Sequence, residues 1–256
     1  MILPNFICIG AQRAGTTWLH RMLLSHPGIY LPAQKELHYF DEKPDFSDYQ
    51  GLGKKWMGKR PYYDMNDRAD WLWYQEQFKA GWDHKIRGEI TPFYATLSDQ
   101  RVACMADKLS ALKLIYIIRN PIKRAWSNFR YLCLKEGIGS PSELDGQAMC
   151  DTIMHPQQLR HGEYRRNITI YESHFQPDRI LYLFYDDIVQ KPAEVISQVY
   201  SYLGAANISL PVELMKTKIN SAPSGEMPAG IAAELAAYYA EQFAFVQDKF
   251  KRGLEH

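Results

Sequence analysis

The stretch FICIGAQRAGTTW, from Phe6 to Trp18, decides how the rest of this 256-residue sequence is interpreted. An apolar run from Phe6 to Ile9 leads into a turn between Gly10 and Gly15, and a helical pattern follows directly. Backbone N–H groups at a helix N-terminus converge on an anion, and the helix dipole favours negative charge there. The stretch therefore predicts a buried strand, an anion-binding loop and a helix.

The composition describes a globular chain with balanced charge. Hydrophobic residues make up 46%, which is enough for a substantial core, and we expect one domain. Lys plus Arg number 30 and Asp plus Glu 29, so the net charge of +1 gives no reason to expect a nucleic-acid or membrane partner. The four cysteines lack the short spacings of zinc sites: Cys8, Cys104, Cys133 and Cys150.

The two ends of the sequence bear on location and domain limits. The opening MILPNF lacks a basic segment followed by a long apolar run, and no stretch reaches the roughly 18 apolar residues of a membrane span. We therefore expect a cytoplasmic protein with reduced thiols. Leu254 to His256 resembles the start of a polyhistidine tag, so the expected domain covers residues 1–253.

Apolar segments alternate with amphipathic ones along most of the chain. We predict strands in Asn5–Ile9, Ile29–Leu31, Leu112–Ile118 and Arg179–Tyr185, and a strand that begins the stretch Lys85–Tyr94 and is ended by Pro92. We predict helices in Thr16–Ser25, Arg101–Leu109, Ile122–Leu134, Gly162–Phe175, Pro192–Leu203 and Gly230–Phe250. This alternation predicts a single-domain α/β fold of P-loop type, a mostly parallel sheet with helices on both faces and the ligand at the carboxyl ends of the strands.

Two regions fit this alternation less well. Residues 42–84 are rich in Trp and Tyr, and we expect loops and short helices that cover a cleft, with the aromatic rings in core and lid packing or, alternatively, in a sugar-stacking platform. Residues 136–161 are polar and broken by turn formers, so no regular element is predicted there.

The spacing of Gly10 and Gly15 matches the start of the nucleoside triphosphate loop GxxxxGK[ST]. That loop uses its lysine and Mg²⁺ to balance the charge of the β- and γ-phosphates. Here the lysine position is occupied by Thr16, and the cation of the loop is Arg13. The loop therefore favours an anion of lower charge that needs no metal, such as a phosphate ester carrying a sulfuryl group.

GAQRAGTTWL resembles the 5′-phosphosulfate loop of the sulfotransferases that use 3′-phosphoadenosine 5′-phosphosulfate (PAPS). The resemblance implies a cofactor-binding set of Gln12, Arg13, Ala14, Gly15, Thr16, Thr17 and Trp18. IIRNPIKRAWSNFRY is similar to the 3′-phosphate site of the same family, and Arg119 and Ser127 match the residues that grip this phosphate.

KELHYFD, from Lys35 to Asp41, resembles a segment of the heparan-sulfate-type branch, and its Glu36 matches the proposed catalytic base. His38 is the alternative base. GEITPFY and HGEYRRNITIYESHFQPDRILYLFYDDI also follow the pattern of that branch, so the resemblance covers nearly the whole chain. Tyr164 either packs in the core or contacts the nucleotide, and Gly225 falls in a late loop that resembles a cofactor clamp.

The sequence departs from the family pattern at three positions. Arg13 stands where most members have lysine, and arginine binds in a fork and does not lose its proton. Ile90 replaces a lysine that often follows the glutamate of the GEITP segment. Glu226 replaces the arginine of the late clamp, Ser224 to Pro228.

The resemblance implies sulfuryl transfer from PAPS, without a metal, to an acceptor hydroxyl or, as a second choice, an amine. In-line attack would release adenosine 3′,5′-bisphosphate, with Glu36 as general base and Arg13 stabilising the charge that develops. Arg119 and Ser127 would hold the 3′-phosphate. The acceptor stays open among small molecules, lipids, saccharides and carrier-bound intermediates.

Two other functions are considered. A kinase or NTPase gains some support from ILYLFYDD, Ile180 to Asp187, an apolar strand that ends in paired carboxylates like a Mg²⁺-binding segment. The missing lysine at Thr16 argues against it. A non-catalytic PAPS-fold binding protein would keep the loop but lose turnover, and the presence of Arg13 and Glu36 argues against that alternative.

Overall fold

The structure is a computed structural model that describes residues 2–42, 49–54, 61–216 and 225–254. The chain forms two compact units built from alternating segments. Unit 1 comprises Met1–Glu42, Pro61–Ile118 and Thr169–Ile219, and unit 2 comprises Lys43–Arg60, Arg119–Ile168 and Asn220–His256. Because the chain passes back and forth between these segments, the units are parts of one α/β domain and not consecutive domains.

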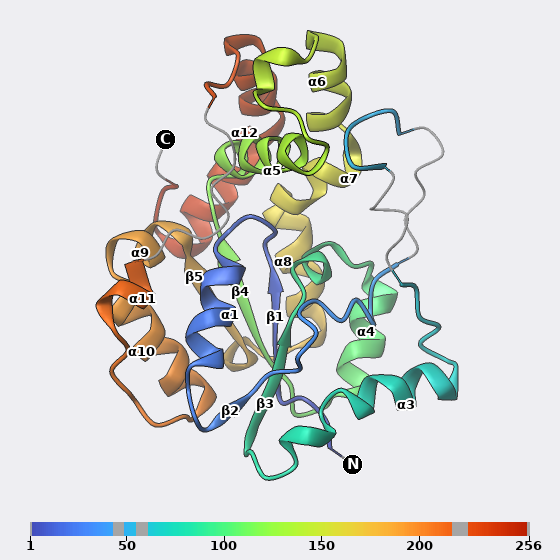
Figure 1. The fold of residues 1–256 in the computed structure, drawn as a ribbon, viewed down its shortest axis with the longest axis vertical. Coiled ribbons are helices and arrows are strands. Elements are labelled where there is room, and N and C mark those ends of the chain that lie inside the picture. Colours follow the sequence, from blue (N-terminus) through green and yellow to red (C-terminus); the bar gives the residue numbers. More distant parts are fainter. Residues whose placement is uncertain (1, 43–48, 55–60, 217–224, 255–256) are drawn as a thin grey trace. The chain divides into compact units, whose positions relative to one another are not determined.

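Unit 1 contains a five-stranded parallel sheet, in the order β2-β3-β1-β4-β5 (Figure 1). Its central strand, β1, is buried at every position, as expected of a strand covered on both faces. This arrangement confirms the predicted fold. The strands are β1 (Phe6–Gly10), β2 (Ile29–Tyr30), β3 (Ile86–Ile90), β4 (Lys113–Ile118) and β5 (Ile180–Phe184).

Helices flank this sheet on both sides (Figure 1). Helix α1 (Thr16–Leu24) joins β1 to β2 in one direction along the sheet, and α4 (Asp99–Lys108) joins β3 to β4 in the opposite direction. Right-handed crossovers therefore place α1 and α4 on opposite faces. Helix α10 (Pro192–Leu203) lies on the α1 side, where the Tyr200 hydroxyl donates to the Met22 carbonyl over 3.4 Å.

The other α-helices that lie wholly within unit 1 are short. They are α3 (Arg68–Glu76), α9 (Tyr185–Gln190) and α11 (Val212–Lys216). Helix α8 (Tyr164–His174) begins in unit 2 and ends in unit 1. None of the helices in the described part of the chain has the length and hydropathy of a membrane span.

Unit 2 is helical. It contains α5 (Pro121–Lys135), α6 (Gly146–Ile153), α7 (Pro156–Leu159) and α12 (Ala229–Phe250). Its core joins one face of α5 to α6 and α12, and is formed by Ala125, Trp126, Phe129, Cys133, Met149, Ile153, Leu159, Ile231, Leu235 and Tyr239.

The structure corrects the prediction for residues 136–161, which contain α6 and α7. The Asp145 side chain caps α6 by accepting the Ala148 N–H over 2.8 Å, and Met149 and Ile153 are buried. The polar turn formers were therefore caps and not signs of an irregular segment. Leu254 is buried, whereas residues 255–256 lie outside the described residues, so the predicted boundary at 253 stays a prediction.

Candidate active site

The loop between β1 and α1 has the geometry of an anion-binding site. Gly15, the N-cap of α1, adopts the left-handed conformation (φ 95°, ψ 10°), and the first turn of α1 holds no acidic residue. A Cβ atom at Gly15 would lie 3.3 Å from Ile188 Cδ1 and 3.4 Å from Tyr185 Cδ2. Both the left-handed backbone and these close neighbours therefore favour glycine at this position. The first N–H groups of α1 have no partner within the helix and can bind a negatively charged group.

The predicted loop residues take different places. The Ala14 N–H donates to the Ala11 carbonyl over 3.1 Å within the loop, and the assignment of Ala14 to the anion site stays a prediction. The Trp18 indole N–H donates to the Met215 carbonyl over 2.9 Å, and the assignment of Trp18 to the cofactor site stays a prediction. The Gln12 Oε1 atom is buried without a partner among the described residues, and an amide flip would present its NH₂ group instead.

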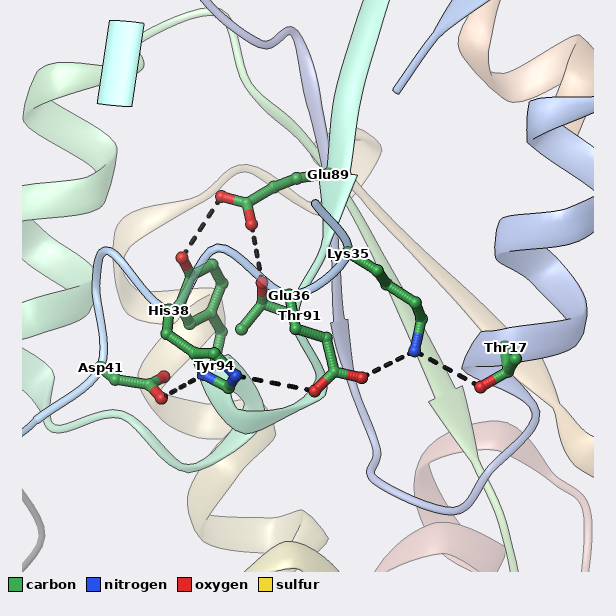
Figure 2. A network of polar contacts seen from close by, with 8 residues as sticks. All are labelled: Thr17, Lys35, Glu36, His38, Asp41, Glu89, Thr91 and Tyr94. Atoms are coloured by element: carbon green, nitrogen blue, oxygen red, sulfur yellow. Dashed lines mark hydrogen bonds and ion pairs between the residues drawn. The ribbon is translucent and has the colours of Figure 1, made fainter. Parts of the chain in front are cut away.

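The segment from Lys35 to Asp41 carries a chain of polar contacts beside this loop (Figure 2). Lys35 Nζ lies 2.7 Å from Glu36 Oε1 and 3.4 Å from Thr17 Oγ1. His38 Nε2 lies 3.7 Å from Glu36 Oε2, and His38 Nδ1 lies 2.6 Å from Asp41 Oδ2. The structure thus brings Thr17, Glu36 and His38 together, and Lys35 connects the anion loop to the carboxylate.

Two of these residues, Lys35 and Asp41, were not predicted as site residues. Both lie within the KELHYFD segment, at one residue before Glu36 and three residues after His38. Asp41 could have been predicted from the sequence, because it stands near His38 and a carboxylate beside one ring nitrogen fixes the tautomer and orientation of a histidine.

The backbone is strained at three predicted site residues. Arg13, Glu36 and His38 have φ values of 64°, 63° and 59°, and Lys251 is the other residue with positive φ besides glycines in the described part of the chain. Positive φ is uncommon outside glycine and costs about 1–3 kcal/mol per residue. Such strain persists where the surroundings over-determine the conformation, as they do at functional sites.

Glu89 forms a buried polar centre next to the Lys35–Asp41 segment (Figure 2). The hydroxyl groups of Tyr74 and Tyr94 donate to Glu89 Oε1 over 2.7 and 3.3 Å, and that of Thr91 donates to Oε2 over 2.7 Å. Burial raises the pKa of Glu89, and these donors oppose the shift. The Tyr94 hydroxyl also accepts the Phe40 N–H over 3.4 Å, so the Glu89 centre supports the Lys35–Asp41 segment.

The predicted 3′-phosphate residues lie in unit 2, where the chain leaves β4. The Arg119 N–H donates to the Tyr164 hydroxyl over 3.1 Å, and this hydroxyl donates in turn to the Arg119 carbonyl. Tyr164 is fully buried, and burial raises its pKa to about 12, so the phenol is neutral. Tyr164 therefore positions the Arg119 backbone, which favours its role in the core over contact with a nucleotide.

Ser127 and Gly225 lie on neighbouring segments of the same unit. Ser127 is 6% exposed on α5, and the Asn120 side chain caps this helix by accepting the N–H groups of Ile122 and Lys123 over 3.0 Å. The Trp126 indole donates to the Gly225 carbonyl over 3.0 Å, which fixes the late loop next to the residue that precedes Ser127. Glu226 is exposed, and Ser224 lies outside the described residues.

The described residues contain no obvious set of metal ligands. Among the described residues, no group of three or more His, Cys, Asp or Glu side chains is arranged to hold an ion. The prediction of a metal-free site stays a prediction.

The parallel sheet, with its first strand opening onto an anion-binding loop at a helix N-terminus, defines a P-loop-like α/β protein. Residues 4–208 match the model of the sulfotransferase family, so the chain belongs to that family and the predicted recognition is confirmed.

Relatives of known type agree with this assignment. The chain is 30% identical over 131 residues to the membrane-associated sulfotransferase kil1 of Dictyostelium discoideum, covering 51% of this chain and 23% of the relative. It is 25% identical over 215 residues to heparan sulfate glucosamine 3-O-sulfotransferase 3B1 of Homo sapiens, covering 80% and 47%. The chain thus spans about half or less of the length of these curated relatives.

The fold has a close counterpart among solved structures. A sulfotransferase from Alicyclobacillus acidocaldarius superposes with a TM-score of 0.74 at 22% identity, covering 99% of this chain and 98% of the other. At this level of identity the similarity establishes the fold.

Proposed function

We propose that this protein transfers the sulfuryl group of PAPS to an acceptor hydroxyl, with an amine as the less favoured acceptor. The observation that carries the proposal is the contact of Lys35 with both Thr17 and Glu36. This contact joins an anion loop that lacks the kinase lysine to a carboxylate that can accept a proton. Family membership supports the same reaction class.

The residues of the anion loop fit the phosphosulfate end of PAPS. The uncapped N–H groups of α1 and the Thr17 hydroxyl supply donors, and Arg13 and Lys35 supply positive charge. A monoanionic sulfuryl group on a phosphate carries less charge than a triphosphate, so two cations and a helix N-terminus suffice without Mg²⁺. Gly225 and the loop residues Gln12, Ala14, Gly15, Thr16 and Trp18 complete the proposed cofactor set.

When bound, PAPS supplies a sulfuryl group whose bond to the phosphate oxygen breaks as the bond to the acceptor oxygen forms. Glu36 takes the proton of the acceptor, and its carboxylate becomes neutral. Lys35 then loses its ion-pair partner and is free to stabilise the negative charge that collects near Thr17. The ring of His38, held by Asp41 over 2.6 Å, keeps the second oxygen of Glu36 in place.

Recognition of the 3′-phosphate falls to unit 2 in this proposal. Arg119 supplies a charge-assisted contact and Ser127 a hydroxyl donor. Tyr164 fixes the backbone that carries Arg119, and Trp126 fixes the loop at Gly225.

The acceptor is proposed only as a class. The names of the heparan sulfate 3-O-sulfotransferase relatives favour a saccharide hydroxyl, and small alcohols, lipids and carrier-bound intermediates remain alternatives. The aromatic rings around Tyr39 support packing and not sugar stacking, since Tyr39 is fully buried and stacks on Tyr74 at 4.5 Å between centroids.

Transfer of label from [³⁵S]PAPS in the presence of EDTA tests the function. The protein is incubated with separate pools of saccharides, alcohols, phenols and amines, beside an Arg13→Ala variant. We expect one pool to gain label with the wild-type protein and to lose it with the variant. Binding of ATP with Mg²⁺ and no binding of adenosine 3′,5′-bisphosphate would favour the kinase alternative. Tight bisphosphate binding with no transfer to any pool would favour a binding protein.

A further inference from the structure

Arg124, in the second turn of α5, is a fully buried cation with no carboxylate partner among the residues that the structure describes. Its side chain is 0% exposed, and its Nη2 atom donates to the Gln158 carbonyl over 2.7 Å. Its Nε and Nη1 atoms are buried without an acceptor at hydrogen-bonding geometry in the described part of the chain. No ion pair among the described residues includes it.

The groups around Arg124 are neutral. The Asn128 amide donates to Gln158 Oε1 over 2.6 Å, and the Tyr239 hydroxyl, which lies against Arg124 as a neutral partner, donates to the Leu159 carbonyl over 2.8 Å. The void beside the guanidinium has no room for the centre of a water molecule. The positive charge of Arg124 is therefore not cancelled locally by an acidic side chain among the described residues.

Such a charge is costly for folding. Burial of a charged group without a counter-ion costs several kcal/mol, and apolar residues of similar volume often replace buried ionic groups without loss of stability. A purely structural role at this position would be met by methionine or leucine. The retained charge points to a function that needs positive potential.

The position of Arg124 indicates what this potential acts on. It precedes Ser127 by three residues, so the two side chains share one face of α5, with Cβ atoms about 5–6 Å apart. Its charge also reaches Tyr164, where it opposes the effect of burial on the phenol pKa, and Tyr164 binds the Arg119 backbone. Arg124 thus lies beneath both residues proposed to hold the 3′-phosphate.

We propose that Arg124 is an electrostatic positioning residue that makes the site selective for nucleotides with a 3′-phosphate without touching that phosphate. The inference rests on the proposed function, because it assumes the 3′-phosphate site at Arg119 and Ser127. A buried, uncancelled charge acts through a medium of low effective dielectric constant and is weakly screened by salt. Arg124 therefore attracts a doubly charged phosphate more strongly than an exposed lysine does.

Calorimetry with two nucleotides tests the inference. Adenosine 3′,5′-bisphosphate and adenosine 5′-monophosphate differ only in the 3′-phosphate. In Arg124→Met we expect the affinity for the bisphosphate to fall about tenfold or more. The variant removes a unit charge about 10 Å from the 3′-phosphate, and the effective dielectric constant there is near 20. Monophosphate affinity should change less than twofold. Lys123→Met removes an exposed charge from the same helix and should change neither affinity by more than about twofold.

An equal loss of affinity for both nucleotides in Arg124→Met would show a merely structural role and overturn the proposal. If Arg124→Met fails to fold, the pH dependence of nucleotide selectivity in Arg124→Lys tests the proposal instead. A buried lysine has a lowered pKa, so this variant should lose 3′-phosphate selectivity as the pH rises from 6 to 9, while the wild-type protein keeps it. Constant selectivity in the lysine variant would overturn the proposal. A wild-type protein that binds both nucleotides equally would instead contradict the proposed function.

Discussion

Replacement of Glu36 by glutamine removes the proposed base and leaves the shape of the side chain nearly unchanged. The φ value of 63° at this position is equally unfavourable for both residues, so the backbone strain is the same in both proteins. The lost ion pair with Lys35 joins side chains that are 29% and 26% exposed, and such pairs contribute about 0.2–1 kcal/mol to folding. We therefore expect a variant that folds with nearly unchanged stability.

The effect on catalysis should be much larger than the effect on folding. A positioned general base contributes about 10²–10⁴-fold to rate, equivalent to at least about 2.7 kcal/mol of transition-state stabilisation. Initial rates of transfer from labelled PAPS should fall by at least about 100-fold, while calorimetry gives the same affinity for adenosine 3′,5′-bisphosphate. Glu42→Gln, an exposed carboxylate six residues later, serves as the control. Retention of more than a few per cent of activity would refute the role of Glu36.

Three further substitutions test other parts of the site. Arg13→Ala should lower the transfer rate about 10²–10³-fold, because it removes a donor that stabilises the developing charge, and Arg13→Lys should lower the rate far less. Equal rates in wild type and Arg13→Ala would contradict a catalytic role of the loop. Asp41→Asn should reduce the rate about tenfold at constant nucleotide affinity, because His38 loses its orientation, whereas Asp99→Asn, at a similar 2.8 Å contact with His174, should have no effect. Because burial raises the pKa of Glu89, the folded state binds its proton more tightly than the unfolded state does, and this contribution to stability is lost as pH rises through the raised pKa. Chemical denaturation should therefore show the stability of wild type falling relative to Glu89→Gln between pH 4 and 8, and parallel curves would mean that the pKa of Glu89 is unshifted.

The sheet was predictable because each of its long strands is a compact apolar run. FICIG and KLIYII are buried along nearly their whole length, and this pattern is typical of strands covered on both faces of a parallel sheet. Helix α10 was equally clear, since Pro192 begins it and Gly204 ends it in the left-handed conformation. Helices α6 and α7 were missed, because they are short and derive their stability from packing in unit 2 and not from a long periodic pattern.

The site was predictable only in part. Glycine spacing and resemblance identified the anion loop and Glu36, since these depend on residue types at fixed separations. The support from Glu89 was missed, because Glu89 lies on strand β3 and its partner Tyr74 lies 15 residues away, on helix α3. Arg124 also gave no signal in the sequence, where it reads as one more cation on a helix. Burial and the lack of a counter-ion become visible only when the helices of unit 2 are packed.

The central claim is a metal-free site that recognises a 3′-phosphorylated adenine nucleotide. Calorimetric titration of the wild-type protein with adenosine 3′,5′-bisphosphate and with ADP, both in EDTA, measures this most directly. We expect the bisphosphate to bind at least about 100-fold more tightly than ADP, since charge-assisted contacts to a phosphate contribute about 1.5–3 kcal/mol each. Equal affinities, or bisphosphate binding that requires Mg²⁺, would contradict the account.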